Sequence, residues 1–405
     1  MNWQPSYAIT IDGVDETTFT LARAQIATGR GGVDEQAKAG YLKLTVHDES
    51  GTRPRPRLRS PITVDIDAGD GPVRLFTGTI VNCRTAMWQD GAPVRYHLTA
   101  AGPLARLHRG RVPDGGYPQQ RDGDRVAAVL DTLAIDWTQA GPYSWASFPD
   151  RSWIDADPVG VEVDTPGQYL LAGDPEPRDA ASVVLQAAQD GLGQLEETRR
   201  GAIRYTDAVG RLTRATAGYV DLPTPAPGLE AVQSIGDVVN SVAVEYIDGD
   251  QVGVVSARDE QAIADLGGEV LHETVQTRLV NAGDAQGRAD RYVGLRSRPA
   301  VRVEDLTVHV TGDLDVGMRR AMFELEPGAP VRLRRLPRAL GRSLVGFVER
   351  LSWTLTGGAA TVVLLVSDWR LSEQALTWGG VEDTVGWVTV DGTISWTRAQ
   401  ELTSG

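Results

Sequence analysis

The chain contains two stretches in which apolar and polar residues alternate in the same order. The first spans residues 61–100 and the second spans residues 330–366, and each holds three alternating runs separated by turns rich in glycine, proline or aspartate. Each stretch begins with a proline, and its middle run carries a glycine, Gly78 or Gly346. Alternation with a period of two between such turns predicts antiparallel β-strands.

Short sequence matches lie upstream of both stretches. The tetrapeptide Leu-Thr-Val-His occurs at residues 44–47 and 306–309, and the tripeptide Ile-Asp-Gly at residues 11–13 and 247–249. Their common order predicts one β module used twice, with extra residues in the second copy between its first two matches. The alternative is that two unrelated β-rich segments resemble each other by chance.

Between the predicted modules the apolar residues follow helical spacing. Asp124 and Asp284 each precede apolar residues at this spacing and are expected to cap helices. A further helix is predicted over residues 179–190, ending at Gly191. Residues 194–213 contain short alternating runs and a turn, which predict a small hairpin sheet.

These patterns predict a mainly β fold with an α+β insertion, in which two similar antiparallel β-barrel modules flank an α+β domain. We expect four parts along the chain: a first β-barrel module at 1–108, an α+β domain at 109–229 that residues 257–300 join, a second β-barrel module at 230–256 and 301–372, and a Trp-rich hairpin at 373–405.

The C-terminal residues form a separate candidate site. Trp378, Trp387 and Trp396 are evenly spaced, and Asp391-Gly392 between the last two is a two-residue hairpin signal. In that register Trp387 lies opposite Trp396, where side chains of neighbouring strands come closest. The three tryptophans are therefore candidate interface residues; the alternative is a hairpin that these side chains stabilise by themselves.

Composition limits the kinds of partner. The chain has 405 residues, 41% of them apolar, which is enough for several packed domains. Its formal net charge of −14 argues against a generalised surface for nucleic acid or anionic membrane, although a local basic patch stays open. No apolar run approaches the length of a membrane span, and the N-terminus has no signal-peptide pattern. We expect neither specific nucleic-acid binding nor a membrane span.

Candidate chemistry is sparse. The lone Cys83 excludes an intrachain disulfide, and no serine lies in a nucleophile elbow. Gly191-Leu-Gly193 follows a helix, so it is not a dinucleotide loop. The histidines have no metalloprotease spacing: His47, His97, His108, His272 and His309. We expect no catalytic, metal or cofactor site, although a glycosidase pair of carboxylates can come from anywhere in a chain.

The motifs resemble those of phage tail-tip baseplate hub proteins, the minor tail proteins of siphophages that infect actinobacteria. The similar segments are residues 61–66, 74–80, 98–107, 189–193, 203–205, 239–246 and 285–299. The resemblance implies two β-barrels and an α+β domain in each subunit, and a virion structural protein without enzyme activity. Relatives that carry an enzyme append it after the hub, and only residues 373–405 follow here.

The resemblance also implies partners. Three subunits are expected to form a homotrimeric ring under the distal tail protein, with the tape measure protein and receptor-binding proteins as further neighbours. Two modules in each of three chains offer six similar units, which would adapt a sixfold tail tube to a threefold tip through contacts between the first module of one chain and the second of the next. The alternative function is a tail protein that binds or degrades cell-wall glycan.

Overall fold

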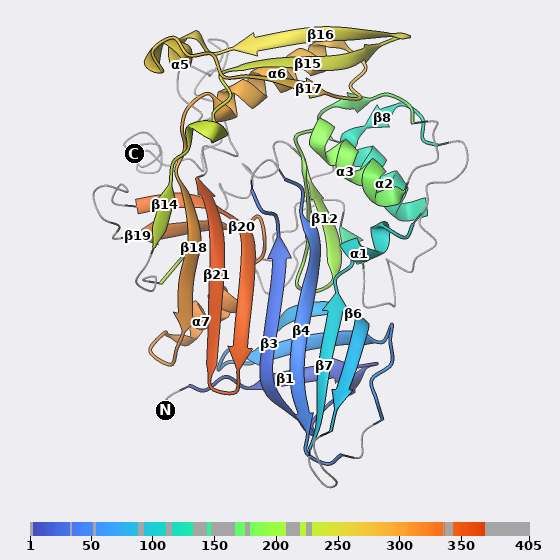
Figure 1. Ribbon diagram of the computed structural model, residues 1–405, viewed down its shortest axis with the longest axis vertical. Helices are drawn as coiled ribbons and strands as arrows, with labels where there is room; N and C mark the ends of the chain where they lie inside the picture. Colours follow the sequence, from blue (N-terminus) through green and yellow to red (C-terminus); the bar gives the residue numbers. More distant parts are fainter. Residues whose placement is uncertain are drawn as a thin grey trace, which may run out of the picture.

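In the computed structural model the chain is mainly β, with large antiparallel sheets and a few helices. The structure describes residues 3–32, 35–51, 54–87, 93–110, 116–132, 144–146, 167–174, 179–207, 219–223, 229–334, 336 and 343–368. Its largest sheet has 13 strands and contains both predicted modules (Figure 1). Three small sheets lie outside it.

The first module contains the N-terminal strands. Its hydrogen-bonded order is β3-β4-β7-β6-β5-β1-β2. In β4 the side chains of Leu42, Leu44 and Val46 are buried, whereas Lys43 between them is exposed, as the alternation predicts. The strands are β1 (Tyr7–Ile11), β2 (Val14–Asp15), β3 (Phe19–Gly29), β4 (Lys38–Asp48), β5 (Pro61–Asp67), β6 (Pro72–Ala86) and β7 (Val94–Ala101).

The second module repeats the strand order of the first. The order β18-β21-β20-β19 matches β4-β7-β6-β5, and every pair in both series is antiparallel. Leu306 of the repeated tetrapeptide lies opposite Leu364, as Leu44 lies opposite Leu98. The predicted repeat is therefore present. The strands of the second module are β13 (Val220–Asp221), β14 (Glu230–Val232), β18 (Arg302–Val310), β19 (Pro330–Arg334), β20 (Ser343–Thr356) and β21 (Ala359–Asp368).

A β-bulge occurs at the same place in both copies. The ladder of β6 with β7 shifts register between Ile80 and Asn82, and the ladder of β20 with β21 shifts between Val348 and Arg350. A bulge bends its strand and increases the local twist. Both long strands therefore bend at this point, and each belongs to two parts of its module. A shared irregularity of this kind supports common topology more strongly than shared alternation does.

The neighbouring strand leaves no room for a side chain at the glycine of each middle strand, which lies close to this bend. A Cβ on Gly78 would lie 2.7 Å from the carbonyl oxygen of Ala101, and a Cβ on Gly346 would overlap the carbonyl oxygen of Ser367. Both oxygens belong to the neighbouring strand at the end of its ladder. Only glycine lets the two backbones approach so closely.

The two modules share one hydrophobic core. Apolar side chains from both lie in a single buried cluster, in which the Phe323 ring is 5.3 Å from the Trp353 ring and 5.9 Å from the Trp3 ring. Phe323 ends α7 (Val316–Phe323), which begins at the capping carboxylate of Asp315. The N-terminal segment thus packs against the second module.

A second core belongs to the α+β part. The helices α2 (Asp122–Thr132) and α3 (Ala180–Asp190) pack with the hairpin of β11 (Gln194–Glu197) and β12 (Ala202–Thr206). The predicted helix over residues 179–190 is confirmed, and Asp179 caps it. The hairpin at 194–206 is confirmed as well. Nearby lie α1 (Leu104–Leu107), β8 (Gln120–Arg121), β9 (Ser144–Ala146) and β10 (Leu170–Leu171).

The segment 230–256 does not open the second module as expected. Only β14 of this segment pairs with β18; β15 (Ser241–Asp248) and β16 (Gln251–Arg258) form their own sheet with β17 (His272–Gln276). This sheet packs on α6 (Ala282–Arg296), beside η1 (Ile235–Asp237) and α5 (Glu260–Asp265). Valines of β15 belong to the α+β core.

Two sequence-based expectations are wrong here for physical reasons. Alternation fixes which face of a strand is buried but not its partner strand, so the Ile-Asp-Gly match at residues 247–249 marks only a similar hairpin turn. The helix expected to be capped by Asp284 begins earlier, because the side chain of Asn281 accepts from the backbone N–H of Asp284 at 2.7 Å.

Candidate functional site

The two modules join through a strand pair inside the large sheet. The second half of β20 pairs with β3 over residues 350–355, so that Trp353 lies opposite Ile26. Both side chains are buried. This internal seam makes β18, β21, β20, β3, β4, β7 and β6 one continuous sheet (Figure 1).

A buried ion pair fixes the end of the seam. The Nε of Arg30 lies 2.5 Å from Oε2 of Glu349, and both side chains are almost excluded from solvent. The hydroxyl of Ser367 donates to Oε1 of Glu349, and the backbone N–H of Arg30 donates to the carbonyl of Glu349 at 2.9 Å. Since a buried charge without a partner is costly, these groups hold the modules in one register.

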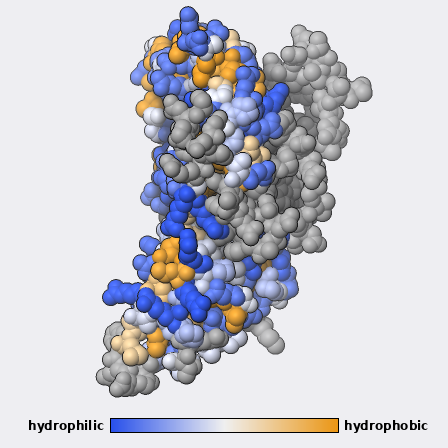
Figure 2. Space-filling view, turned by 90° about the vertical axis from the view of Figure 1, so that its right-hand side faces the viewer, coloured by the Kyte–Doolittle hydropathy of each residue, from blue (hydrophilic) through white to orange (hydrophobic). Residues whose placement is uncertain are grey.

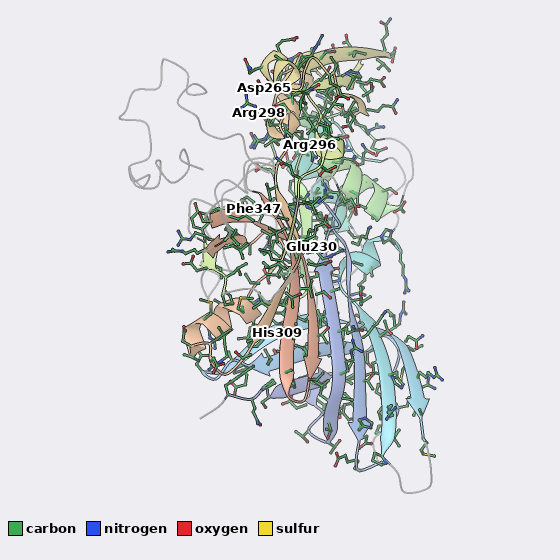
Figure 3. All side chains as sticks on the ribbon, turned by 60° about the vertical axis from the view of Figure 1, so that its left-hand side comes forward. Glu230, Asp265, Arg296, Arg298, His309 and Phe347 are labelled. Atoms are coloured by element: carbon green, nitrogen blue, oxygen red, sulfur yellow. The ribbon has the colours of Figure 1, made fainter. Side chains whose placement is uncertain are left out.

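Within the described residues, each module has a strand edge without a strand partner at the place where the other module is paired, although the side chain of Arg55 donates to the carbonyl oxygen of Cys83 in β6. When the two modules are aligned at their bulges, residues 82–86 of β6 correspond to residues 350–354 of β20. β14 corresponds to β3, because Ala231 lies opposite Val303 of β18 as Ile26 lies opposite Leu42 of β4. Within the described residues, no strand pairs with β6 beyond residue 79 on its outer side or with the outer side of β14. Figure 3 labels Glu230 on this outer strand.

Exposed apolar side chains lie beside both edges. Met87 is 65% exposed, whereas Leu355, the residue at the equivalent place in β20, is 0% exposed because β3 covers it. Val81 and Leu58 are also exposed near the β6 edge, and Ile235 follows β14 and is exposed. Figure 2, which views the molecule from the side of β6, shows an apolar patch bordered by strongly hydrophilic residues.

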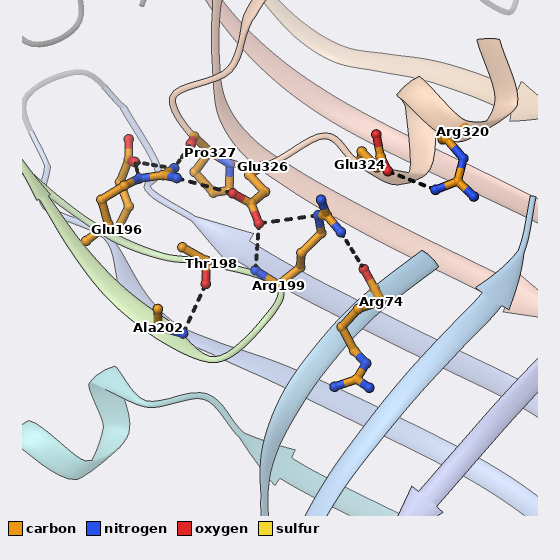
Figure 4. A network of polar contacts seen from close by, with 10 residues as sticks. Arg74, Glu196, Thr198, Arg199, Ala202, Arg320, Glu324, Glu326 and Pro327 are labelled. Carbon is orange, nitrogen blue, oxygen red and sulfur yellow. Dashed lines mark hydrogen bonds and ion pairs between the residues drawn. The ribbon is translucent and has the colours of Figure 1, made fainter. Parts of the chain in front are cut away.

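The tip of the β11–β12 hairpin contacts both modules through a buried polar network (Figure 4). Arg204 donates to Glu196 at 2.8 Å and to Glu326 at 3.3 Å, and all three side chains are buried. Glu326 also accepts from the backbone N–H of Arg199 at 3.0 Å, while the Arg199 side chain reaches the carbonyl of Arg74 in β6. The hairpin therefore fixes the α+β part against the sheet on both sides of the internal seam.

Glu197 docks the same hairpin onto the first module. Its two carboxylate oxygens accept from the backbone N–H groups of Gly40 and Leu104, each at 2.6 Å. Burial raises the pKa of Glu197 to about 7, while the two N–H donors oppose that rise. Burial likewise raises the pKa of Asp122 and of Asp190 to about 6 in the α+β core.

The structure does not place the sequence-predicted interface residues, because Trp378, Trp387 and Trp396 lie outside the described residues. In the described part of the chain, no group of three or more His, Cys, Asp or Glu side chains could hold a metal ion. No helix described there is long and apolar enough to cross a membrane.

Sequence reasoning missed the residues that join the two modules to each other and the α+β part to the large sheet. Arg30 and Glu349 are 319 positions apart, and Arg204 and Glu326 are 122 apart, so no local spacing signals either pair. One usable signal was present: the glycine before Arg30, at the end of an alternating strand, marks a close backbone approach.

Comparison with known proteins finds relatives of this fold by structural similarity and none by sequence similarity. No protein-family model and no curated protein sequence matches the chain. The 43 kDa tail protein of prophage MuSo2 from Shewanella oneidensis is 12% identical with a TM-score of 0.58, over 91% of this chain and 99% of that one. This chain has a phage tail protein fold.

Two further tail proteins share this fold. The tail protein from Neisseria meningitidis MC58 is 14% identical with a TM-score of 0.56, over 91% of this chain and 99% of that one. Prophage tail protein gp18 from Listeria monocytogenes EGD-e is 10% identical with a TM-score of 0.50, over 89% and 94% of the two chains. The phage tail protein fold thus extends over nearly the whole length of each.

Proposed function

We propose that the chain is a baseplate hub of a phage tail tip, a structural virion protein whose three copies form a ring. The observation that carries the proposal is the internal seam between β20 and β3 together with its two unpaired counterparts, the β6 edge at residues 82–86 and β14. Repeating the seam between the β6 edge of one chain and β14 of the next makes every junction alike. Such a head-to-tail contact forms a closed ring when its rotation closes.

The proposed ring has six similar modules and threefold symmetry. It would adapt a sixfold tube, through the distal tail protein, to a threefold tip that contacts the tape measure and receptor-binding proteins. The α+β part occurs once per chain, so it reduces the symmetry from six to three. No catalytic step belongs to this function.

The internal seam also specifies the register between chains. Trp353 opposite Ile26 corresponds to Thr85 of one chain opposite Ala231 of the next. In this register Met87 would occupy the covered position that Leu355 has inside the chain. The main-chain pairing is that of an added edge strand, and the apolar side chains beside it supply buried area.

Cysteine cross-linking tests this register. Thr85→Cys and Ala231→Cys are introduced together with Cys83→Ser, and the protein is treated with a short thiol cross-linker. We expect covalent dimers and trimers and no larger product, because three links close the ring. The matched control replaces Ala231→Cys with Gln251→Cys, an exposed position on the separate sheet of β16. Equal cross-linking of the control, or a ladder that reaches six copies, contradicts the ring.

Mass measurement under native conditions gives an independent readout. The expected species is a trimer of the 43.6 kDa chain. The enzymatic alternative is tested separately by incubating the protein with host cell walls. Reproducible release of sugar or peptide that one Asp or Glu substitution abolishes would replace the structural proposal with a cell-wall-degrading one.

A further inference from the structure

The outward face of the large sheet carries polar rows beside the internal seam, one of which crosses it. One row runs through His309, Thr361, Thr354, Gln25, Lys43, Thr99 and Asn82, which the strand registers place side by side. Figure 3 labels His309 at one end of this row. The next row on the first module runs through Arg23, Thr45, His97 and Arg84.

On β3, β4, β6, β7 and β20 the described residues of this face include exposed basic side chains and no exposed carboxylate, whereas Asp305 on β18 is exposed. Arg23, Lys43, Arg84 and Arg350 are exposed on β3, β4, β6 and β20. Among the described residues of these strands and β7, the acidic side chains are Asp48 and Glu349, and both are buried. In a chain of net charge −14, a five-strand face without an exposed acid is a local exception.

The net charge of the whole chain does not cancel this local field. Charges farther apart than the Debye length, about 8 Å at physiological salt, are largely screened. Neighbouring strands lie about 4.8 Å apart, so Arg23 and Arg84, three strands apart, are separated by roughly 14 Å across a surface that holds no exposed acid between them. A ligand on this face therefore meets positive charge.

We propose that this face binds the sugar-phosphate backbone of nucleic acid without sequence preference. Duplex DNA carries one negative charge per about 1.7 Å of axis, and arginine, lysine, threonine, asparagine and glutamine side chains are the usual phosphate contacts. In the part of the chain that the structure describes, this face consists of β-strands that present these side chains, and it has no helix that would enter a groove and read bases.

An acidic protein fits the same face less well. Protein interfaces bury an apolar centre with aromatic anchors. The exposed large hydrophobic side chains described on β3, β4, β6, β7 and β20 are Tyr41, whose ring centroid lies 5.3 Å from Nζ of Lys43, and Val81. The inference concerns the isolated chain and does not depend on ring formation, so the two proposals fail separately.

The test measures fluorescence anisotropy of a short labelled DNA duplex with the full chain. If three side chains each neutralise one phosphate, the affinity falls roughly 40-fold between about 50 mM and about 200 mM salt. The variant Arg23→Gln/Lys43→Gln/Arg84→Gln is expected to lose at least about tenfold in affinity at the lower salt concentration, together with most of this salt dependence. Lys43→Gln alone should lower the slope of the logarithmic plot by about one.

The matched control removes the same number of positive charges elsewhere. Arg109→Gln/Arg258→Gln/Arg334→Gln changes exposed residues outside the face and is expected to retain the affinity of the unmodified chain. Equal loss in both triple variants, or no binding by the unmodified chain at low salt, overturns the proposal. Polyglutamate that displaces the duplex at equal charge concentration overturns it in favour of an acidic protein partner.

Discussion

At the scale of single residues, the junction between the modules depends on a missing side chain. Gly29 has a φ of +108°, and a Cβ at this position would overlap the carbonyl oxygen of Glu349 and lie 2.7 Å from Cα of Arg350. The following residue makes the buried ion pair of the seam. One glycine thus permits a close backbone contact between the two halves of the chain.

Gly29→Ala is expected to destabilise the protein by more than about 2 kcal/mol, because the backbone conformation and the contact both oppose a side chain. Urea unfolding followed by tryptophan fluorescence measures the change. Gly358→Ala is the control, since nothing lies within 4 Å of a Cβ there, and it should change stability little. A loss of the same size in both variants would show that the contact at Gly29 is unimportant.

The carboxyl of Glu197 predicts a pH dependence of stability. Its pKa rises from 4.5 to about 7 on folding, so the native state binds a proton more readily than the unfolded chain. The stabilisation is complete below pH 4.5 and is lost as the pH rises to about 7. Its size is on the order of 3 kcal/mol at about 1.4 kcal/mol per pKa unit.

Glu197→Gln should therefore reduce the fall in unfolding free energy between pH 4.5 and pH 7. It cannot abolish the fall, because the pKa values of Asp122 and Asp190 are raised in the same direction. Denaturant unfolding across this range measures the slope, and hydrogen exchange at the Gly40 and Leu104 amides reports the local contact. An unchanged slope together with unchanged exchange would contradict the prediction.

At the scale of elements, the hairpin of β11 and β12 depends on a buried ion-pair network. Arg204→Met removes the cation shared by Glu196 and Glu326 and leaves both carboxylates buried. We expect a loss of about 3–5 kcal/mol in the unfolding free energy. Adding Glu196→Gln and Glu326→Gln should restore part of it, whereas Arg334→Met at an exposed pair should have little effect.

The C-terminal hairpin remains a prediction at this scale. Trp387→Ala/Trp396→Ala should leave the fold of residues 1–372 intact while weakening assembly of the tail tip, because aromatic side chains contribute strongly to interfaces. Circular dichroism measures the first effect, and co-assembly with neighbouring tail proteins measures the second. Normal infection by a phage whose mutated residues stay solvent-exposed in assembled tails would refute the docking role.

Elements with strong local signals could be predicted from sequence, and their partners could not. The helix over residues 179–190 and the hairpin at 194–206 follow from periodicity, turn residues and a capping position, all of them local. The wrong assignment of β15 and β16 shows the limit, since alternation is the same whichever strand lies beside it. The ion pairs that join the parts have no local signal at all.

At the scale of the whole molecule, the repeat was the sequence feature that predicted most about the arrangement of the chain. It predicted two copies of one strand order and a contact between unlike modules, because order is preserved even where single residues differ. It did not show that the two copies already share a seam within one chain. That seam is what makes the unpaired edges at β6 and β14 recognisable as counterparts.

A charge at the β6 edge should separate folding from assembly. Met87→Glu places a carboxylate where the proposed neighbour would cover an apolar side chain, and the exposed position tolerates it in the single chain. We expect a folded monomer with an unchanged melting temperature and no trimer in sedimentation experiments. Val252→Glu, at a residue that is 68% exposed on the separate sheet, is the control and should still assemble. A trimer formed equally by both variants would rule out this edge.

The internal seam also sets the order in which the protein can be made. β3 is complete near residue 29, but its partner in β20 is translated only after residue 350. At about 5–20 residues per second, the edge of β3 waits roughly 15 to 65 s for that partner. An unpaired edge strand can meanwhile join the same strand of another nascent chain. Arg23 and Gln25, which point away from the core along this edge, give the waiting strand a polar face until the last module reaches it.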